Sequence, residues 1–258
     1  MTLERLSCGK EGGLEMKTMR LLDYRISYNS LPELLSIFND IFRRKEYSFK
    51  DFKEGKEPLF IIDCGAHIGL ATLYFKREYP ESEIIAFEPN PETFKLLTRN
   101  VENNNLESIT LVQAALSGQD GERMLFLSRK DWHWEDSLIV PRRDGGRTIN
   151  VPTKRLSPYV DKRVDLLKVD IEGAEAEVIR ELANERKLAR IRRVIIEFHP
   201  ERGGAKRGLE EILKILRSND FNLGFRKIGK IFHPKVSLEE IQKGANCPQI
   251  LIYALRKE

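Results

Sequence analysis

The feature that most constrains the fold is a repeated alternation between short apolar runs and longer amphipathic stretches. Five apolar runs have the length of strands, and they cover residues 59–62, 84–87, 110–116, 164–169 and 194–198. Four amphipathic stretches have helical spacing, and they cover residues 69–78, 91–103, 173–188 and 206–219. Continuous apolar runs are typical of strands that are buried on both faces of a parallel sheet. The alternation therefore predicts an α/β fold, a mostly parallel sheet with helices on both of its faces.

Two parts of the chain interrupt this alternation. Residues 117–153 contain two segments of alternating polarity, 123–128 and 148–153, which predict a small β-ribbon inserted between the third and fourth strands. After residue 220, the segments 222–227 and 249–256 have strand patterns with no helix of comparable length between them. We expect these two segments to complete a seven-stranded sheet as a C-terminal antiparallel hairpin.

The N-terminal part of the chain, residues 1–57, is mixed and charged. Within it, apolar side chains recur at helical spacing from Leu34 to Phe42, and Ser30 can cap the helix that they predict. An apolar stripe of this kind can contact a membrane or a partner, but it more often packs on its own domain. We therefore interpret residues 1–57 as a helical cap over an α/β domain formed by residues 58–258.

The charge balance bears on the class of partner. The 258-residue chain has 44 basic and 40 acidic residues, so its formal net charge is +4. Its basic clusters, at residues 43–45, 142–143 and 190–193, are short, whereas nucleic-acid-binding proteins usually have a stronger or more clustered excess. The charge balance therefore disfavours a nucleic-acid partner, and RNA is kept as an alternative.

Cysteine usage and hydropathy indicate the compartment. Cys8, Cys64 and Cys247 are widely spaced and odd in number, so they predict neither a disulfide framework nor a zinc site. No apolar run approaches the roughly 18 residues that a membrane span requires. Charged residues such as Glu4 and Arg5 stand where a signal peptide would have its apolar core. We expect a cytoplasmic protein.

The first motif with chemical content is the turn after the first apolar run. Residues 60–70 read FIIDCGAHIGL, a pattern of strand, tight turn and helix start. The helix N-terminus offers free N–H groups to a ligand, but G-x-x-x-G differs from the G-x-G-x-x-G of dinucleotide-binding turns. An acid at the end of the strand would repel a pyrophosphate, and it suits the cationic amino acid end of a sulfonium donor. An NAD-dependent oxidoreductase is the alternative. The turn predicts a site for S-adenosylmethionine that consists of Asp63, Gly65, Ala66, His67 and Gly69.

A second acid, Glu88, follows the next apolar run. An acid at this distance from the glycine turn ends the neighbouring strand, where it can accept hydrogen bonds from both ribose hydroxyls of the donor. The alternative is an acid at a helix entry, because Asn90 and Pro91 have the pattern of a cap and a first turn. The two roles are compatible. Pro89 and Ala115 complete the predicted donor-binding set.

A third group of acids surrounds the end of the fourth strand. Asp170 and Glu172 follow the apolar run, and Lys168 lies within it. Ligands of open α/β sheets bind beyond the carboxyl ends of the strands. We therefore expect Asp170 and Glu172 to face the site, and Lys168 to be oriented by neighbouring carboxylates. Glu175 and Glu177 fall in the first turns of the next helix, where compensation of the helix dipole explains them.

The fifth strand ends in a candidate catalytic pair. Alternation puts Glu197 and His199 on one face of this strand, beside the fourth strand. An alcohol must lose its proton to accept a methyl group, and we predict His199 or Asp170 as the base. Glu172 and Glu197 would orient that base or the acceptor. The same four side chains could hold a divalent cation, but no ligand spacing supports one, so we predict no metal.

Both tryptophans of the chain lie in the inserted segment, where residues 131–137 read DWHWEDS. Paired aromatic rings beside polar groups suit stacking on the face of a sugar or a base. We predict that Trp132, His133 and Trp134 bind the acceptor as a lid. The alternative is that one tryptophan only anchors a long loop.

Together these motifs resemble the FkbM family of S-adenosylmethionine-dependent methyltransferases. The resemblance is carried by DCGAHIG, FEPNP, KVDIEGAE and IIEFH, in this order, and it extends over residues 59–198. It implies a Rossmann-like class I methyltransferase fold, and O-methylation of a hydroxyl on a small molecule or sugar. It also implies that Asp63, Gly65, Gly69 and Glu88 bind the donor, and that Asp170 and Glu172 face donor and acceptor.

The sequence departs from the family pattern at His67, where asparagine is more frequent. Either side chain can form local hydrogen bonds, so we expect donor binding to be little affected. An RNA or protein acceptor remains an alternative, and so does a binding module that keeps the donor site without turnover. Residues 1–57 and the tryptophan loop lie outside the resemblance, and we expect them to select the acceptor.

Overall fold

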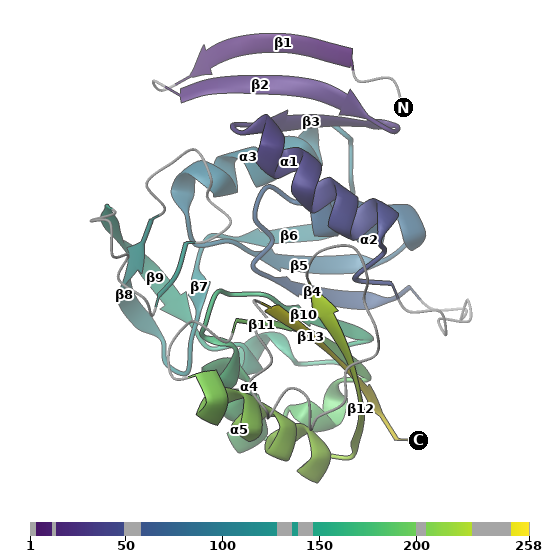
Figure 1. The fold of residues 1–258 in the computed structure, drawn as a ribbon, viewed down its shortest axis with the longest axis vertical. Coiled ribbons are helices and arrows are strands. Elements are labelled where there is room, and N and C mark those ends of the chain that lie inside the picture. The colour runs from purple at the N-terminus through teal and green to yellow at the C-terminus, as the bar shows by residue number, and fades with distance from the viewer. Residues whose placement is uncertain are drawn as a thin grey trace.

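The centre of the protein is a mostly parallel sheet of seven strands (Figure 1). A computed structural model describes residues 4–11, 14–48, 58–127, 136–138, 147–199, 205–228 and 249–257. The strands lie in the order β12-β13-β11-β10-β4-β5-β6. Their bounds are β4 Phe60–Cys64, β5 Glu83–Phe87, β6 Ile109–Val112, β10 Leu166–Val169, β11 Arg193–Phe198, β12 Phe221–Ile228 and β13 Gln249–Arg256. Neighbours from β6 to β11 are parallel, and β13 is antiparallel to β11 and to β12. The predicted α/β architecture and its antiparallel hairpin are confirmed.

Helices cover both faces of the sheet because its strands are apolar on both sides. Alternation along β4 sends Ile61 toward one face and Ile62 toward the other, and neither side chain is exposed. Ile62 joins a core that includes the helices α4 (Glu175–Asn184) and α5 (Ala205–Ser218). Ile61 joins a second core that includes α2 (Leu70–Glu78). The continuous apolar runs of the sequence thus supply both layers.

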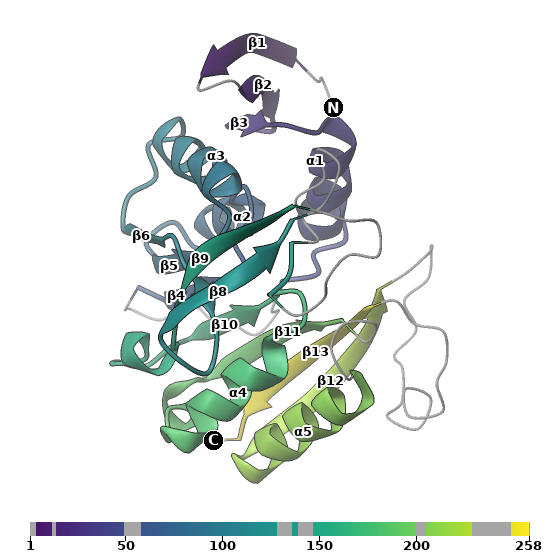
Figure 2. The same ribbon diagram turned by 90° about the vertical axis from the view of Figure 1, so that its left-hand side faces the viewer.

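The third apolar run is divided between two sheets, where the sequence predicted one strand. Strand β6 ends at Val112, and the chain turns there, with the backbone N–H of Ala114 donating to the carbonyl of Val112 at 3.0 Å. β7 (Ala115–Leu116) then pairs with β9 (Thr148–Lys154), which also pairs with β8 (Gly121–Phe126). The predicted ribbon is therefore part of a three-stranded sheet beside the main one (Figure 2).

The N-terminal extension is only partly helical, which corrects the helical cap that the sequence predicted. Three strands precede the helix and form an antiparallel sheet in the order β1-β2-β3. The bounds are β1 Glu4–Glu11, β2 Leu14–Leu21, β3 Tyr24–Tyr28 and the predicted helix α1 Leu31–Phe38, which continues into a π-helical turn, Asn39–Arg43. The physical reason is that β2 pairs with both β1 and β3. The pairing satisfies the backbone N–H and C=O groups of these segments, although none of them has a long apolar run.

A buried asparagine of helix α3 (Pro91–Glu102) attaches this extension to the rest of the chain. The side chain of Asn100 accepts a hydrogen bond from the backbone N–H of Ser27 at 2.6 Å, and donates to the carbonyls of Ser27 and Ile68 at 3.0 and 2.8 Å. Buried side chains of β2, β3 and α1 share one core with α2. The extension therefore packs over α2 and α3 (Figures 1 and 2). Of the helices in the described ranges, none has the length and apolarity that a membrane crossing requires.

Candidate active site

The turn between β4 and α2 requires glycine at both of its predicted positions. Gly65 has a φ of +80°, and a Cβ there would lie 1.8 Å from the carbonyl oxygen of Asp170. Gly69 has a φ of +90°, and a Cβ there would lie 2.7 Å from a methyl carbon of Leu97. The close approach that these glycines permit is therefore to the end of β10 and to α3, and it fixes the path of the turn.

Asp63 is an internal anchor of this turn. The residue is fully buried, its Oδ1 lies 3.1 Å from Nζ of Lys168, and its Oδ2 accepts a hydrogen bond from the hydroxyl of Thr72 at 2.8 Å. Lys168 also donates to the carbonyl of Gly65 at 2.8 Å. Burial alone would lower the pKa of Lys168, but Asp63 and Asp170 raise it above its ordinary value. The sequence predicted that Asp63 faces the donor, whereas in the structure this carboxylate points toward Lys168.

Glu88 lies just beyond β5, in the position that the sequence predicted. Its two carboxylate oxygens accept hydrogen bonds from the backbone N–H groups of His67 and Asn90, at 3.0 and 2.9 Å. Burial raises the pKa of Glu88 to about 7. Asn90 also caps α3, since its side chain accepts from the backbone N–H of Glu92 at 2.9 Å. The acid is thus held in one orientation at a helix entry, and ribose binding stays a prediction.

A cavity of about 340 Å³ lies beside the turn, within the range of small-molecule sites, roughly 300–1,000 Å³. Most of the predicted donor and catalytic residues line it: Gly65, Ala66, His67, Glu88, Pro89, Ala115, Asp170, Glu172 and Glu197. The predicted residues Asp63, Gly69 and His199 do not line it. The extension contributes Ser36, Ile37, Asp40, Ile41, Glu46 and Tyr47 to the wall. The cavity therefore joins the glycine turn to the acids that end β10 and β11.

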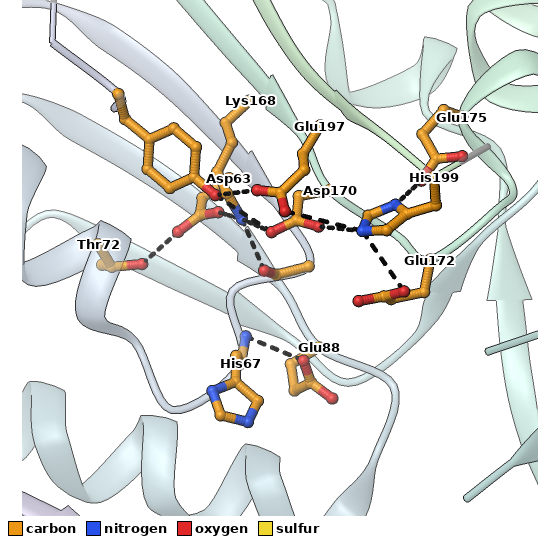
Figure 3. A network of polar contacts seen from close by, with 12 residues as sticks. Asp63, His67, Thr72, Glu88, Lys168, Asp170, Glu172, Glu175, Glu197 and His199 are labelled. Atoms are coloured by element: carbon orange, nitrogen blue, oxygen red, sulfur yellow. Dashed lines mark hydrogen bonds and ion pairs between the residues drawn. The ribbon is translucent and has the colours of Figure 1, made fainter. Parts of the chain in front are cut away.

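Three carboxylates surround the imidazole of His199 at these strand ends (Figure 3). Nε2 of His199 lies 3.5 Å from a carboxylate oxygen of Glu172. It lies 3.8 Å from an oxygen of Glu197 and 3.9 Å from an oxygen of Asp170. The His199 side chain is 1% exposed, whereas that of Asp170 is 22% exposed. The four residues predicted as catalytic thus form one cluster, which we call the acid–histidine cluster.

The other ring nitrogen of His199 contacts a residue that the sequence analysis explained by the helix dipole alone. Nδ1 lies 3.1 Å from Oε1 of Glu175, and the same oxygen accepts from the backbone N–H of Gly173 at 2.9 Å. Burial alone would lower the pKa of His199, but Glu172, Glu175 and Glu197 raise it to about 10. Asp170 lines the cavity whereas His199 does not, which favours Asp170 over His199 as the base.

Tyr47 joins the acid–histidine cluster from the extension and was not predicted. Its hydroxyl lies 3.0 Å from Oε2 of Glu197 and 3.2 Å from Oδ2 of Asp170, to either of which it can donate. Burial, with the neighbouring Asp170 carboxylate, raises the pKa of Glu197 well above its ordinary value. Burial likewise raises the pKa of Tyr47. No signal pointed to Tyr47, because it lies in a charged segment outside every motif.

The glycine turn also meets the extension, at His67. This residue has a left-handed backbone with a φ of 52°, and its Nε2 lies 3.4 Å from Oε1 of Glu33 in α1. Burial alone would lower the pKa of His67, but the Glu33 carboxylate raises it. The side chain of His67, the residue that departs from the family pattern, therefore contacts the extension, while its backbone N–H donates a hydrogen bond to Glu88.

The predicted acceptor residues Trp132, His133 and Trp134 lie outside the described residues, so the lid stays a prediction. The segment that follows them reaches the cavity, which Asp136 and Leu138 line. The hydroxyl of Ser137 donates to the carbonyl of Glu172 at 2.6 Å, and the amide of Asn90 donates to Asp136 at 2.6 Å. Glu172 has a φ of 56°, which is uncommon outside glycine. The hydrogen bond from Ser137 therefore stabilises a strained backbone conformation in the site.

The fold and the site together define the class of protein. Strand β13 lies between β11 and β12 and is antiparallel to both, whereas the other neighbouring strands are parallel. A sheet of this kind, with a glycine turn and an acid at neighbouring strand ends, is the arrangement of class I methyltransferases. The family description "Methyltransferase FkbM domain" matches residues 63–226. The chain belongs to the FkbM family of methyltransferases. The family implies S-adenosylmethionine as the methyl donor.

Individual relatives agree with this assignment. The chain is 31% identical to methyltransferase sdnD of Sordaria araneosa over 224 residues, which are 74% of this chain and 85% of the relative. It is 27% identical to the 31-O-demethyl-FK506 methyltransferase FkbM of Streptomyces tacrolimicus over 240 residues, 81% of this chain and 90% of the relative. A solved FkbM methyltransferase from Methylobacillus flagellatus has a TM-score of 0.50 at 16% identity, covering 79% of this chain and 45% of that one. This last likeness bears on the fold alone.

Proposed function

We propose that the chain transfers the methyl group of S-adenosylmethionine to a hydroxyl group of a small molecule or a sugar. The observation that carries the proposal is that Asp170 and Glu197 line the same cavity as Glu88 and the glycine turn. Carboxylates in this place can bind a hydroxyl group and accept its proton. The Streptomyces tacrolimicus relative is named for methylation at an oxygen of FK506, which supports an oxygen acceptor.

Each part of the site then has a task. The donor supplies a methyl group that is activated by its sulfonium charge. Glu88, fixed by two backbone N–H groups, holds the ribose and so sets the direction of the methyl group. Asp170 is the most exposed carboxylate of the acid–histidine cluster, and we assign it to the acceptor hydroxyl. Alignment of this kind reaches effective molarities on the order of 10⁵ M or more, and a placed base adds about 10²- to 10⁴-fold.

The charge of the cavity favours a neutral acceptor over RNA. Among the described residues, seven acidic ones line it: Asp40, Glu46, Glu88, Asp136, Asp170, Glu172 and Glu197. His67 and Lys168 are the basic residues of this described lining. A phosphodiester backbone would be repelled by such a wall, whereas hydroxyl groups of a sugar or polyol donate hydrogen bonds to carboxylates. An acceptor without negative charge is therefore the better fit.

Donor binding and acceptor chemistry can be tested separately. Calorimetry should show binding of S-adenosylmethionine and S-adenosylhomocysteine, and none of NAD. Radiolabelled donor should then transfer its methyl group to an oxygen in a panel of sugars, polyols and hydroxylated aromatic compounds, with RNA and a protein mixture in parallel. Asp170→Asn should lower the turnover number by about 10²- to 10⁴-fold while S-adenosylhomocysteine still binds. Transfer to RNA, protein or a nitrogen acceptor instead, or full turnover by Asp170→Asn, would contradict the proposal.

A further inference from the structure

We infer that Asp170, Glu172 and His199 bind one divalent transition-metal cation, and that this cation holds the acceptor hydroxyl. The ion site stands on its own geometry, and its role toward the acceptor rests on the proposed function. One ligand atom from each side chain can be chosen so that all three lie within 4.8 Å of one another. Two atoms at about 2.1 Å from a shared ion are about 3.0 Å apart at a right angle and about 4.2 Å apart when opposite. The distances from His199 Nε2 to Glu172 and Asp170, 3.5 and 3.9 Å, fall within this interval.

The second observation is the way in which His199 is held. Its side chain is 1% exposed, and within the described ranges its Nε2 has no hydrogen-bond partner. This atom faces the carboxylates of the acid–histidine cluster (Figure 3). On the other side of the ring, Nδ1 lies 3.1 Å from the fully buried Glu175, whose oxygen is fixed by the backbone N–H of Gly173. A metal-binding histidine usually donates its second N–H to a carboxylate in this way, which orients the first nitrogen toward the ion.

The charge around the ring also favours a cation. Four carboxylates contact or surround one imidazole, those of Asp170, Glu172, Glu175 and Glu197. Lys168 is a cation beside this cluster, but it lies closer to Asp63 than to Asp170, at 3.1 against 3.4 Å. Buried negative charge is costly unless cations or hydrogen bonds compensate it. A divalent ion among these groups supplies the compensation, and it remains in place when the sulfonium charge of the donor is lost.

The types of ligand atom in this site indicate which metal ions fit. Imidazole with carboxylates suits Mn²⁺, Fe²⁺, Co²⁺ or Zn²⁺, whereas Ca²⁺ and Mg²⁺ are usually bound by oxygen atoms alone. Asp170 and Glu172 line the cavity, so the ion keeps open positions on the side where the acceptor binds. A hydroxyl group on such an ion loses its proton more readily, and the proton passes to the carboxylate oxygen of Asp170 that does not bind the ion. Its oxygen then forms the bond to the methyl carbon, and the methyl–sulfur bond breaks with its electron pair left on sulfur.

Metal binding is measured on the full chain without any acceptor. After treatment with a chelator and its removal, the protein is titrated with Mn²⁺ by electron paramagnetic resonance, and with Zn²⁺ and Mg²⁺ by calorimetry. We expect one Mn²⁺ or Zn²⁺ per chain, and at least tenfold weaker binding in Glu172→Gln and His199→Asn. Glu175→Gln should weaken binding by about 10- to 100-fold. The matched control is Glu177→Gln, in the same helix as Glu175 but paired with Arg123, and it should bind the ion like the wild type.

The outcomes separate the ion from the proposed function. Binding of S-adenosylhomocysteine and an unchanged thermal midpoint show that a variant is folded. The ion site is overturned if the wild type binds none of the three ions stoichiometrically. It is also overturned if both Glu172→Gln and His199→Asn keep the wild-type affinity. Full methyl transfer to a hydroxyl acceptor after chelation overturns the ion's role and leaves the proposed function intact. An ion bound at the cluster without transfer to any hydroxyl acceptor contradicts the proposed function and leaves the ion site intact.

Discussion

The two walls of the cavity are built in different ways. The proposed function assigns the methyl donor to the glycine turn and Glu88, which we call the donor wall. These residues come from consecutive βα units whose strands β4 and β5 are paired neighbours. The side of the cavity assigned to the acceptor, the acceptor wall, includes Tyr47 from the extension and Asp136 from the insertion. Tyr47 is 123 and 150 residues away in sequence from its partners Asp170 and Glu197. The topology of the sheet thus fixes the donor wall, whereas added segments form much of the acceptor wall and can change without altering the sheet.

The strongest test of this comparison is Lys168→Met, because Lys168 joins β10 to the donor wall. The change leaves the buried Asp63 without its ion-pair partner and removes the hydrogen bond to the carbonyl of Gly65. We expect the free energy of unfolding to fall by about 3–5 kcal/mol, as measured by urea denaturation at neutral pH. Donor affinity should weaken as well, since Lys168 no longer holds the carbonyl of Gly65 in the glycine turn.

A surface pair provides the matched control. Lys162 and Glu83 form an ion pair whose side chains are 50% and 53% exposed. Lys162→Met should lower the free energy of unfolding by less than about 1 kcal/mol. If Lys168→Met costs no more than this control, the donor wall does not depend on its buried ion pair, and the contrast between the walls loses its basis.

The donor wall is also the part that the sequence predicted well. Apolar runs and helical spacing located the strands, and parallel strands bring their carboxyl ends to one edge. Glu88 and Asp170 were therefore placed near the same cavity without any knowledge of contacts. The direction of Asp63 could not be predicted, because in a strand buried on both faces the sequence does not say which side holds Lys168. Glu175 and Glu177 differ for a similar reason: they start the same helix, yet one faces His199 and the other Arg123.

The contacts that the extension adds to the acceptor wall escaped prediction because they are long-range. Tyr47 belongs to no motif, and only the folded extension brings it to β10 and β11. The strand β2 was missed because its apolar side chains change from even positions (Leu14 and Met16) to odd positions (Met19 and Leu21), which breaks the period of two. The turn at Val112 divided the third apolar run because β7 pairs with β9, which is remote in sequence. Local sequence patterns therefore predict the main sheet, whereas the structure of the extension and the insertion depends on pairing between segments that are distant in sequence.

A smaller effect is expected from the protonation of Glu88. Burial raises its pKa to about 7, while the charge of His67 lowers it and that of Asp136 raises it. If Glu88 binds the ribose as proposed, the carboxylate form accepts both ribose hydrogen bonds, and protonation below this pKa removes one acceptor. Donor affinity, measured by calorimetry, should therefore rise roughly tenfold from about pH 6 to about pH 8. Glu88→Gln should abolish this rise, whereas Glu92→Gln, in the first turn of α3, should retain it. A rise that persists in Glu88→Gln would assign the dependence to another group.

An effect of similar size separates the two walls most directly. Tyr47→Phe removes the hydroxyl that Glu197 and Asp170 share and leaves the donor wall untouched. A lost hydrogen bond to a charged group is worth about 1.5 kcal/mol, so kcat/KM for the acceptor should fall roughly tenfold. The dissociation constant of S-adenosylhomocysteine should stay unchanged. Tyr24→Phe is the control, since its hydroxyl donates to the carbonyl of Leu73, outside the cavity, at 3.3 Å, and both constants should keep their wild-type values. If Tyr47→Phe weakens donor binding instead, the extension belongs to the donor wall, and acceptor choice must then depend on the insertion alone.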